Sequence, residues 1–435
     1  MKKRFFDSAT PFADHVKQII ATQEEAPWLT ALRQQAIQHY QGLPSRQHED
    51  WKYTNLWPIA EQSFTHIAQK SSLSKEKLST LVAFSEAYHV VIVDGQYEPL
   101  LSDQSVLPEG VTIQPITQVM PAAKEKLTQY QHQEKASLSQ LNTALMQTGC
   151  HLVVSAGIKL DKPIELVVIH TGNTPALATH MRHIITLEEE ASMTLVENYI
   201  GESDSEASLT HVHSQITLAK RSQLQHYKIQ QEARQAFHLT KTITEQAQES
   251  QWQYFELTLG GQLSRSDIQT VLLGQQAKSQ LDGLMLLEQE QHADTHMVMS
   301  HQAEHTVSNV LFKTVLNDTS HGVFNGKVVV KPQAQKTDSN QYNHNLLLSE
   351  GCEIDTKPEM EIYADDVACG HGSTVGQLDE SHLFFLQARG IDKELAQSIL
   401  TRGFAMQVLE RIALDNVRDV FSSLIEQRLA RVKSS

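Results

Sequence analysis

A thiol and an imidazole lie two residues apart near the end of the sequence, at Cys369 and His371. The residues around them have a strand-like pattern, and in a strand residues i and i+2 point to the same face. Both side chains can therefore approach one metal ion, and a thiolate with a neutral imidazole suits iron. Two ligands do not complete a tetrahedral site, so any further ligands must come from elsewhere, including a second chain.

The residues alone also fit a structural interpretation of this pair. Free cysteines are commonly buried and inert, and a histidine at the end of a sheet can be satisfied by backbone groups. The other two cysteines are Cys150 and Cys352. Three cysteines in 435 residues do not build a disulfide framework, which indicates a reducing compartment.

Four histidines gather in a short stretch further upstream, at His292, His296, His301 and His305. Histidines four residues apart bind zinc when they lie on a helix. Here the pattern is strand-like, so the side chains divide between two faces, and we expect surface or sheet-stacking residues. The same interpretation applies to His211 and His213, which share one strand face.

A glycine-rich segment, Gly322 to Lys327, superficially resembles a phosphate-binding loop. Its glycines are one residue too close, and Val328 replaces the hydroxyl that would bind magnesium. We therefore exclude nucleotide binding and expect the glycines at a strand corner.

Acidic residues near the end of the chain do not form a convincing acid–base pair. Asp365 and Asp366 are adjacent, so in a strand they would face opposite ways. Residues 355–358 read as a turn. Asp338 is a further acid of the same region, and acidic pairs arise by chance in an acidic chain.

Hydrophobic periodicity divides the chain into three regions. Helical spacing is found over residues 10–45, 73–86 and 124–147, with a short strand at 89–93. Period-2 alternation with short polar corners then dominates from about Cys150 to 385, as in stacked repeats. After Gly390 helical spacing returns, with Asp392 as a candidate N-cap. We expect domains at 1–149, 150–385 and 386–435.

Composition excludes several classes of protein. The formal charge of −15 and the lack of a basic block disfavour nucleic-acid binding. No apolar run approaches the roughly 20 residues of a membrane span, and no signal peptide is recognisable, so a cytoplasmic location is expected. Aromatic residues make up only 6% of the sequence, which argues against a β-helix enzyme acting on carbohydrates.

The sequence resembles the SufB/SufD family, the paired scaffold subunits of the Suf iron–sulfur assembly machinery. The resemblance is most specific in the last third and reaches the N-terminal region. It is carried by residues 49–54, 322–326, 336–338, 343–348, 355–358, 365–367, 369–376 and 384–390. The run after His371 and the absence of cysteines before Cys150 resemble the SufD branch more than the SufB branch.

This resemblance implies a mainly β fold, with a right-handed parallel β-helix flanked by an N-terminal helical and mixed α/β region and a C-terminal helical domain. It implies a non-catalytic scaffold that pairs with a SufB-like subunit and docks a SufC-like ABC ATPase. The docking residues would be Ile399, Leu400, Phe404 and Val408. Cys369 and His371 would then lie near the contact between the two subunits.

The resemblance also implies that the isolated chain binds no cofactor stably, whereas iron or a nascent iron–sulfur cluster is held at the partner interface. The alternatives are a SufB-like subunit that holds the cluster itself, a homomeric structural β-solenoid, and a carbohydrate-active β-helix enzyme. A homodimer in isolation is compatible with the scaffold role.

Overall fold

The structure is a computed structural model and describes residues 17, 27–66, 68, 73–103, 106–116, 124–128, 137–204 and 206–431. Two predicted helical segments are described only in part. Most of residues 10–26, in the segment 10–45, and residues 129–136, in the segment 124–147, lie outside the described residues. In the described part, α2 (Pro27–His39) and α6 (Ser137–Leu145) form helices within these two segments.

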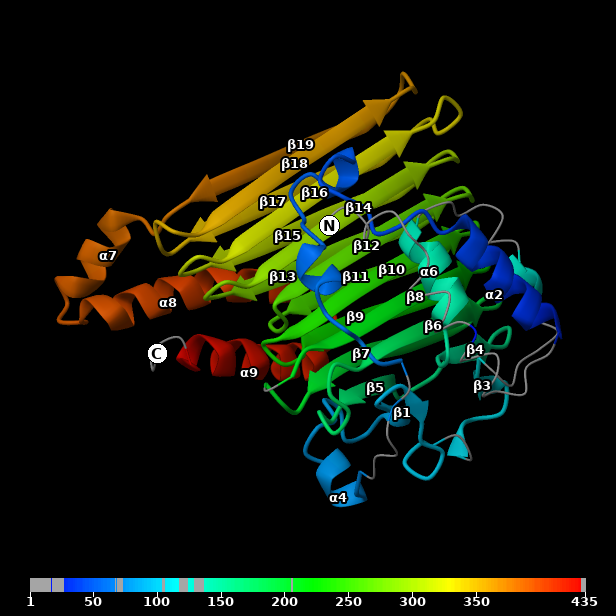
Figure 1. Cartoon of the computed structure of the whole chain (residues 1–435). Coiled ribbons are helices and arrows are strands. Elements are labelled where there is room, and N and C mark those ends of the chain that lie inside the picture. Colours follow the sequence, from blue (N-terminus) through cyan, green and yellow to red (C-terminus); the bar gives the residue numbers. More distant parts are fainter. Residues whose placement is uncertain are drawn as a thin grey trace.

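The chain winds as a β-solenoid of about eight turns, and its successive strands alternate between two mainly parallel sheets (Figure 1). This confirms the fold class expected from the sequence. The ten-stranded sheet contains, in spatial order, β19 (Ala368–Gly376), β17 (Asp338–Leu347), β15 (Val307–Leu316), β13 (Lys278–Leu287), β11 (Gln251–Thr258), β9 (Gln223–Gln231), β7 (Ser192–Gly201), β5 (Ile164–His170), β1 (Tyr88–Val93) and β2 (Gln96–Tyr97). The nine-stranded sheet contains β18 (Glu353–Ile362), β16 (His321–Val330), β14 (His292–His301), β12 (Leu263–Leu272), β10 (Ala236–Gln246), β8 (Ser208–Leu218), β6 (Ala178–Leu187), β4 (Cys150–Val154) and β3 (Val111–Pro115).

Tight corners carry the chain from one sheet to the other. The corner residues Glu190, Arg221 and Gln276 have φ values of 59°, 56° and 61°, in the left-handed region. These are corners that the polar breaks in the alternating pattern predict. Because each strand pairs with the one two elements later, inward-facing residues stack in rows along the solenoid.

The solenoid interior buries charged groups as well as apolar side chains, and those charges are paired. Glu197 lies 3.0 Å from His226, and Lys228 lies 2.9 Å from Glu256. The His226 imidazole and Tyr199 hydroxyl hold the pKa of Glu197 at about 2, against the opposing effect of burial. Pairing offsets the desolvation that isolated buried charges would suffer.

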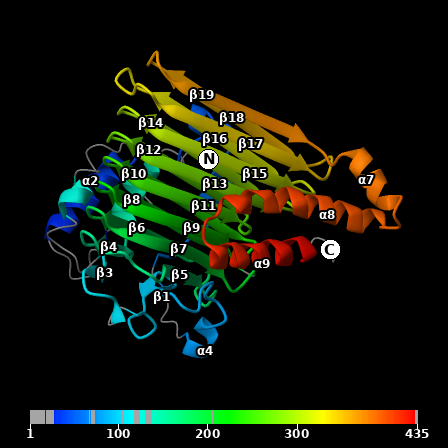
Figure 2. The ribbon, with the colours of Figure 1, turned by 180° about the vertical axis from the view of Figure 1, so that it is seen from behind.

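Helices cover the outer face of each sheet. The apolar faces of α2 and α6 pack on the nine-stranded sheet, where Leu141 and Leu145 meet Phe237. The C-terminal helices cover the ten-stranded sheet, as Figure 2 shows from behind. The remaining helices are η1 (Glu49–Trp51), α3 (Trp57–Ala60), α4 (Lys75–Leu78), α7 (Glu380–Gln387), α8 (Lys393–Met406), η3 (Gln407–Arg411) and α9 (Asp415–Arg431). None of the helices in the described residues is long and apolar enough to cross a membrane.

The two ends of the solenoid differ. At the N-terminal end, β2 and β3 run antiparallel to β1 and β4 and close both sheets. At the C-terminal end, β18 and β19 are the last strands of their sheets, and each pairs on one side only among the described strands. A solenoid end of this kind exposes two rows of backbone groups that are available for pairing.

Two sequence-based interpretations are wrong in this region. Gly322 and Gly326 lie inside β16 rather than at a corner, because glycine gives room there for side chains that cross the interior. Residues 355–358 lie inside β18 rather than in a turn. Asp365 and Asp366 lie in the bend between β18 and β19. The change from strand to helix also precedes residue 386, since α7 begins at Glu380.

Ion pairs fasten the C-terminal helices to the ten-stranded sheet. Arg411 lies 2.8 Å from the buried carboxylate of Asp282, and Arg428 lies 2.8 Å from Glu288. Lys313 donates to the carbonyl of Phe404 at 3.0 Å and to Gln407 at 2.6 Å. These contacts hold η3, α9 and the second half of α8 against the solenoid.

Arg411→Met is expected to lower the free energy of unfolding by about 3 kcal/mol, because it leaves Asp282 buried without its cation. Chemical denaturation at neutral pH measures this loss. Adding Asp282→Asn, which removes the buried charge, should restore most of the stability. A double variant as unstable as Arg411→Met alone would contradict the ion-pair explanation.

The same carboxylate gives stability a pH dependence of predictable sign. Burial raises the pKa of Asp282 to about 6, although Arg411 opposes the shift. The pKa in an unfolded chain is about 3.9. Between these values the folded state binds more protons, so the stability contributed here falls as the pH rises from about 4 to 6. Denaturation across this window should show the slope in the native protein and not in Asp282→Asn.

Candidate functional site

Cys369 and His371 lie in β19, the edge strand of the ten-stranded sheet at the open end of the solenoid (Figure 1). Their register partners in β17 are Ser339 and Gln341, which are both fully buried in the interior. Cys369 and His371 therefore share the inward face of β19, as the i, i+2 spacing predicts. Cys369 is half-buried and His371 is exposed.

The thiol of Cys369 is held in its neutral form. Burial raises its pKa, and the carboxylate of Asp338 acts in the same direction, against a hydrogen bond from the backbone of Ser339. Metal binding requires a thiolate, so binding of a cation would have to displace this proton.

Below Cys369 the interior is lined with hydroxyl groups. Ser339 and Ser308 share a hydrogen bond of 2.8 Å, and His301 lies 2.9 Å from Ser308. Burial lowers the pKa of His301 to about 4, so this imidazole is neutral at physiological pH. His301 is thus a buried partner of hydroxyl groups.

The other histidines divide between faces as the alternating pattern predicts. His292 lies 3.2 Å from His321, and His321 pairs with Asp355 at 2.8 Å. His296 bonds to Arg265 at 3.0 Å, whereas His305 occupies a corner with φ 58°. Within the residues that the structure describes, no three His, Cys, Asp or Glu side chains are placed to hold a metal ion.

The remaining histidines and cysteines have structural surroundings. His211 and His213 are buried in β8, and α6 lies over them through Asn142, which donates to the carbonyl of His211 at 3.1 Å. Cys150 is buried 3.2 Å from the imidazole of His183, and Cys352 is buried near the end of β17. All three cysteines are free thiols, as the sequence predicts.

The edge of β19 offers backbone groups to a partner. The N–H of Ala368 donates to Thr337 in the direction of β17, and hydrogen-bonding direction alternates along a parallel strand. The N–H groups of residues 369, 371, 373 and 375 therefore point away from the solenoid. By the same alternation from Glu353, Pro358 occupies an outward position in β18, where it removes a donor from that edge. The β19 edge is consequently the better one for strand addition.

The predicted docking residues of the C-terminal helices have different environments. Val408 is fully buried against the ten-stranded sheet, and Phe404 is half-buried with Lys313 4.1 Å from its ring. Leu400 is half-buried, whereas Ile399 is exposed. Only the N-terminal part of the predicted set is thus available at the surface. Asp392 caps α8 as predicted, accepting a hydrogen bond from the N–H of Leu395 at 2.8 Å.

α7 and α8 expose four large apolar side chains. We call these residues together the α7–α8 surface: Phe384, Phe385, Leu395 and Ile399. Phe384 is 72% exposed, and α7 buries none of its residues. In Figure 1, α7 projects beyond the ends of the strands, so the solenoid does not cover it. The sequence presents the two phenylalanines as part of a motif, without indicating that they are exposed.

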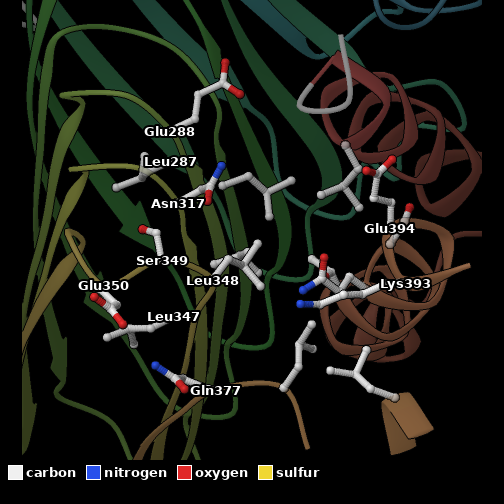
Figure 3. A pocket seen from close by; sticks show the side chains of 18 of the residues that line it. Leu287, Glu288, Asn317, Leu347, Leu348, Ser349, Glu350, Gln377, Lys393 and Glu394 are labelled. Carbon is white, nitrogen blue, oxygen red and sulfur yellow. The ribbon is translucent and has the colours of Figure 1, made fainter. Parts of the chain in front are cut away.

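A cavity of about 880 Å³ separates the α7–α8 region from the solenoid corners. Figure 3 shows Leu287, Asn317 and Leu348 of the solenoid on one side, with Lys393 and Glu394 of α8 on the other. α8 contacts α7, α9 and η3, and it contacts the solenoid at β15.

Comparison with known proteins agrees with this geometry. Residues 168–404 match the family description "SUF system FeS cluster assembly, SufBD core domain", and residues 10–166 match "SufBD protein N-terminal region". The iron–sulfur cluster assembly protein SufD of Escherichia coli is 32% identical over 91% of this chain and 92% of its own. SufD of Bacillus subtilis is 23% identical over 96% of this chain and 97% of its own.

Fold and site together define a β-solenoid with one open end, which presents a half-buried thiol and an exposed imidazole. Together with the matches over both regions, this shows that the chain belongs to the SufBD family of iron–sulfur cluster assembly proteins. The similarity to the SufD branch, expected from the residues after His371, is confirmed by the relatives that carry this name.

Proposed function

We propose that this chain is a non-catalytic scaffold subunit that assembles iron–sulfur clusters together with a SufB-like partner. The observation that carries the proposal is the edge of β19 that faces away from β17, which pairs with no other described strand, at the end that presents Cys369 and His371. A partner strand added to this edge would lie beside both side chains. The remaining ligands of an iron site would then come from the partner or from the sulfide of the cluster.

The chemistry of the two donors supports a transient site. One thiol with a raised pKa and one exposed imidazole supply at most two ligands, which is too few for stable binding of iron by this chain alone. Iron or a nascent cluster is thus cargo held between two chains. The role of this chain is to position donors, so we propose no catalytic step for its residues.

The C-terminal helices supply a second contact, with a SufC-like ATPase. The α7–α8 surface exposes two aromatic and two aliphatic side chains on helices, a typical arrangement for docking into an apolar groove. ATP-driven association of two ATPase subunits would pull on both scaffold chains and change access to the site between them.

Phe384→Asp is expected to abolish capture of the ATPase in a pull-down experiment, because it places a charge on the most exposed residue of the surface. Thermal unfolding should be unchanged. Leu100→Asp is the matched control, since Leu100 is 84% exposed and follows β2, at the opposite end of the ten-stranded sheet from β19 and the α7 helix that follows it. Capture of the ATPase by a chain truncated after Gly390 would count against docking on α8.

Co-purification with the SufB-like subunit and the ATPase, followed by anaerobic iron and sulfide analysis, tests the whole proposal. The complex should contain both elements. A homodimer is the second candidate assembly, because the free edge of β19 can pair with that of another copy when no partner is present. If a homodimer remains when the SufB-like subunit is added in excess, heteromeric pairing is wrong.

A further inference from the structure

The side chain of Gln341 crosses the solenoid interior directly below His371. Gln341 is fully buried in β17, and its Nε2 donates to the carbonyl oxygen of Gly326 in β16 at 3.0 Å. A Cβ at Gly326 would come within 2.5 Å of this nitrogen, so the crossing requires glycine at that position. The hydrogen bond to Gly326 fixes which end of the amide is nitrogen and which is oxygen.

The oxygen of this amide is left without a hydrogen bond. Among the described residues, Gln341 Oε1 is buried and has no partner. A buried acceptor without a donor costs on the order of 1–3 kcal/mol, so such an atom needs an explanation. A donor that reaches it in another state of the protein would recover this free energy.

Within its own sheet, Gln341 has one side-chain N–H donor as a register partner. In its own sheet, its register partners are Val310, which is apolar, and His371. Along β17, Ser339 is bonded to Ser308 and Asn343 donates to the carbonyl of Phe312. Across the interior, Gly326 pairs with Pro358, and neither has a side-chain donor. The buried hydroxyl of Thr356, on the same face of β18, has no hydrogen-bond partner among the described residues and is a second candidate donor. Paired residues of neighbouring strands lie about 4.8 Å apart, so the His371 ring can reach the amide oxygen.

We propose that Gln341 is a positioning residue for His371: its Oε1 accepts the N–H of the imidazole when the other ring nitrogen binds a metal ion. A neutral imidazole has one N–H and one free lone pair, and an acceptor for the N–H fixes the tautomer and ring orientation. Gly326 and Gln341 thus aim the free nitrogen toward the open end. This inference rests on the proposed function, in which His371 is a metal donor.

A double-mutant cycle on the complex of the full-length chain with the SufB-like subunit tests the inference, with Co²⁺ as the probe and its thiolate charge-transfer absorption as the readout. Gln341→Met fills a similar volume without an acceptor and should weaken Co²⁺ binding about 10- to 100-fold. In a His371→Ala background it should have no further effect, whereas a merely structural residue would add its loss to that of His371. Asn345→Leu is the matched control, because this buried amide of β17 pairs with Val375 and should leave affinity unchanged.

The outcomes separate the inference from the proposed function. If the complex that contains His371→Ala binds Co²⁺ as tightly as the native complex, His371 is not a donor and the proposed site is wrong. If His371→Ala weakens binding but Gln341→Met does not, the positioning role is wrong. The positioning role is also wrong if Gln341→Met weakens binding equally in the native and His371→Ala backgrounds. Gly326→Ala displaces the Gln341 amide while keeping Gln341, so it should reproduce the effect of Gln341→Met. If Gln341→Met does not fold, Gly326→Ala provides the test instead.

Discussion

Replacing His371 by alanine is expected to abolish iron–sulfur cluster maturation in cells while leaving the fold and the subunit pairing intact. The side chain is exposed at the end of the solenoid, so its removal should change the free energy of unfolding by no more than about 0.5 kcal/mol. The loss of one of two donors, in contrast, removes half of what this chain contributes to a metal site.

The activity of cluster-dependent enzymes in cells that carry only the variant measures the effect, and co-purification of the partner shows that assembly survives. Ser373→Ala is the matched control, since Ser373 follows on the same face of β19 but supplies neither sulfur nor nitrogen. Normal maturation with His371→Ala would remove the site assignment.

A proline at Val375 is expected to weaken binding of the SufB-like partner at least about tenfold. The N–H of Val375 points away from the solenoid, so proline removes a donor from the pairing edge without breaking the ladder to β17. The lost hydrogen bond is worth about 1 kcal/mol, and the ring obstructs the incoming strand. Together these effects approach or exceed the 1.4 kcal/mol that corresponds to a factor of ten.

Val375→Thr serves as the control, because it keeps the N–H and a β-branched side chain of similar size. Affinity between the purified subunits and thermal unfolding of this chain are measured for both variants. Undiminished affinity of Val375→Pro would mean that the partner does not pair with the β19 edge. The interface would then have to involve β18 or the helices.

The strand pattern and the Cys369–His371 pair could be predicted from the sequence because both depend on local spacing. Alternation fixes which residues share a face, and polar corners fix where the chain turns. Neither property identifies the last strand of a solenoid. Among the described strands β19 pairs only with β17, and this follows from the order of strands in space. From the sequence, the position of Cys369 and His371 near a subunit contact is implied only by the family resemblance.

The burial of Val408 illustrates why the docking residues were only partly predictable. Ile399 and Val408 belong to one apolar stripe in the sequence, and helical periodicity treats them alike. In the structure the N-terminal part of α8 extends beside the cavity toward α7, whereas Val408 packs on the sheet. Which part of a stripe is covered depends on where the solenoid ends, which is a tertiary property.

The glycines of β16 and Pro358 of β18 were misplaced for a related reason. Glycine and proline are typical of corners and turns, so local rules favour a break at both segments. Gly326 instead makes room for Gln341, and Pro358 lies on an edge where its missing N–H disturbs no hydrogen bond. Interior crossings and sheet edges are not visible in local sequence.

The central claim is that this chain is one half of a site that a second chain completes. Anaerobic iron and acid-labile sulfide analysis, on the isolated chain and on its complex with the SufB-like subunit and the ATPase, tests it most directly. We predict that the complex contains both elements, that the isolated chain contains neither, and that His371→Ala depletes the complex. A cluster retained by the isolated chain, or one unaffected by the loss of His371, would contradict the account.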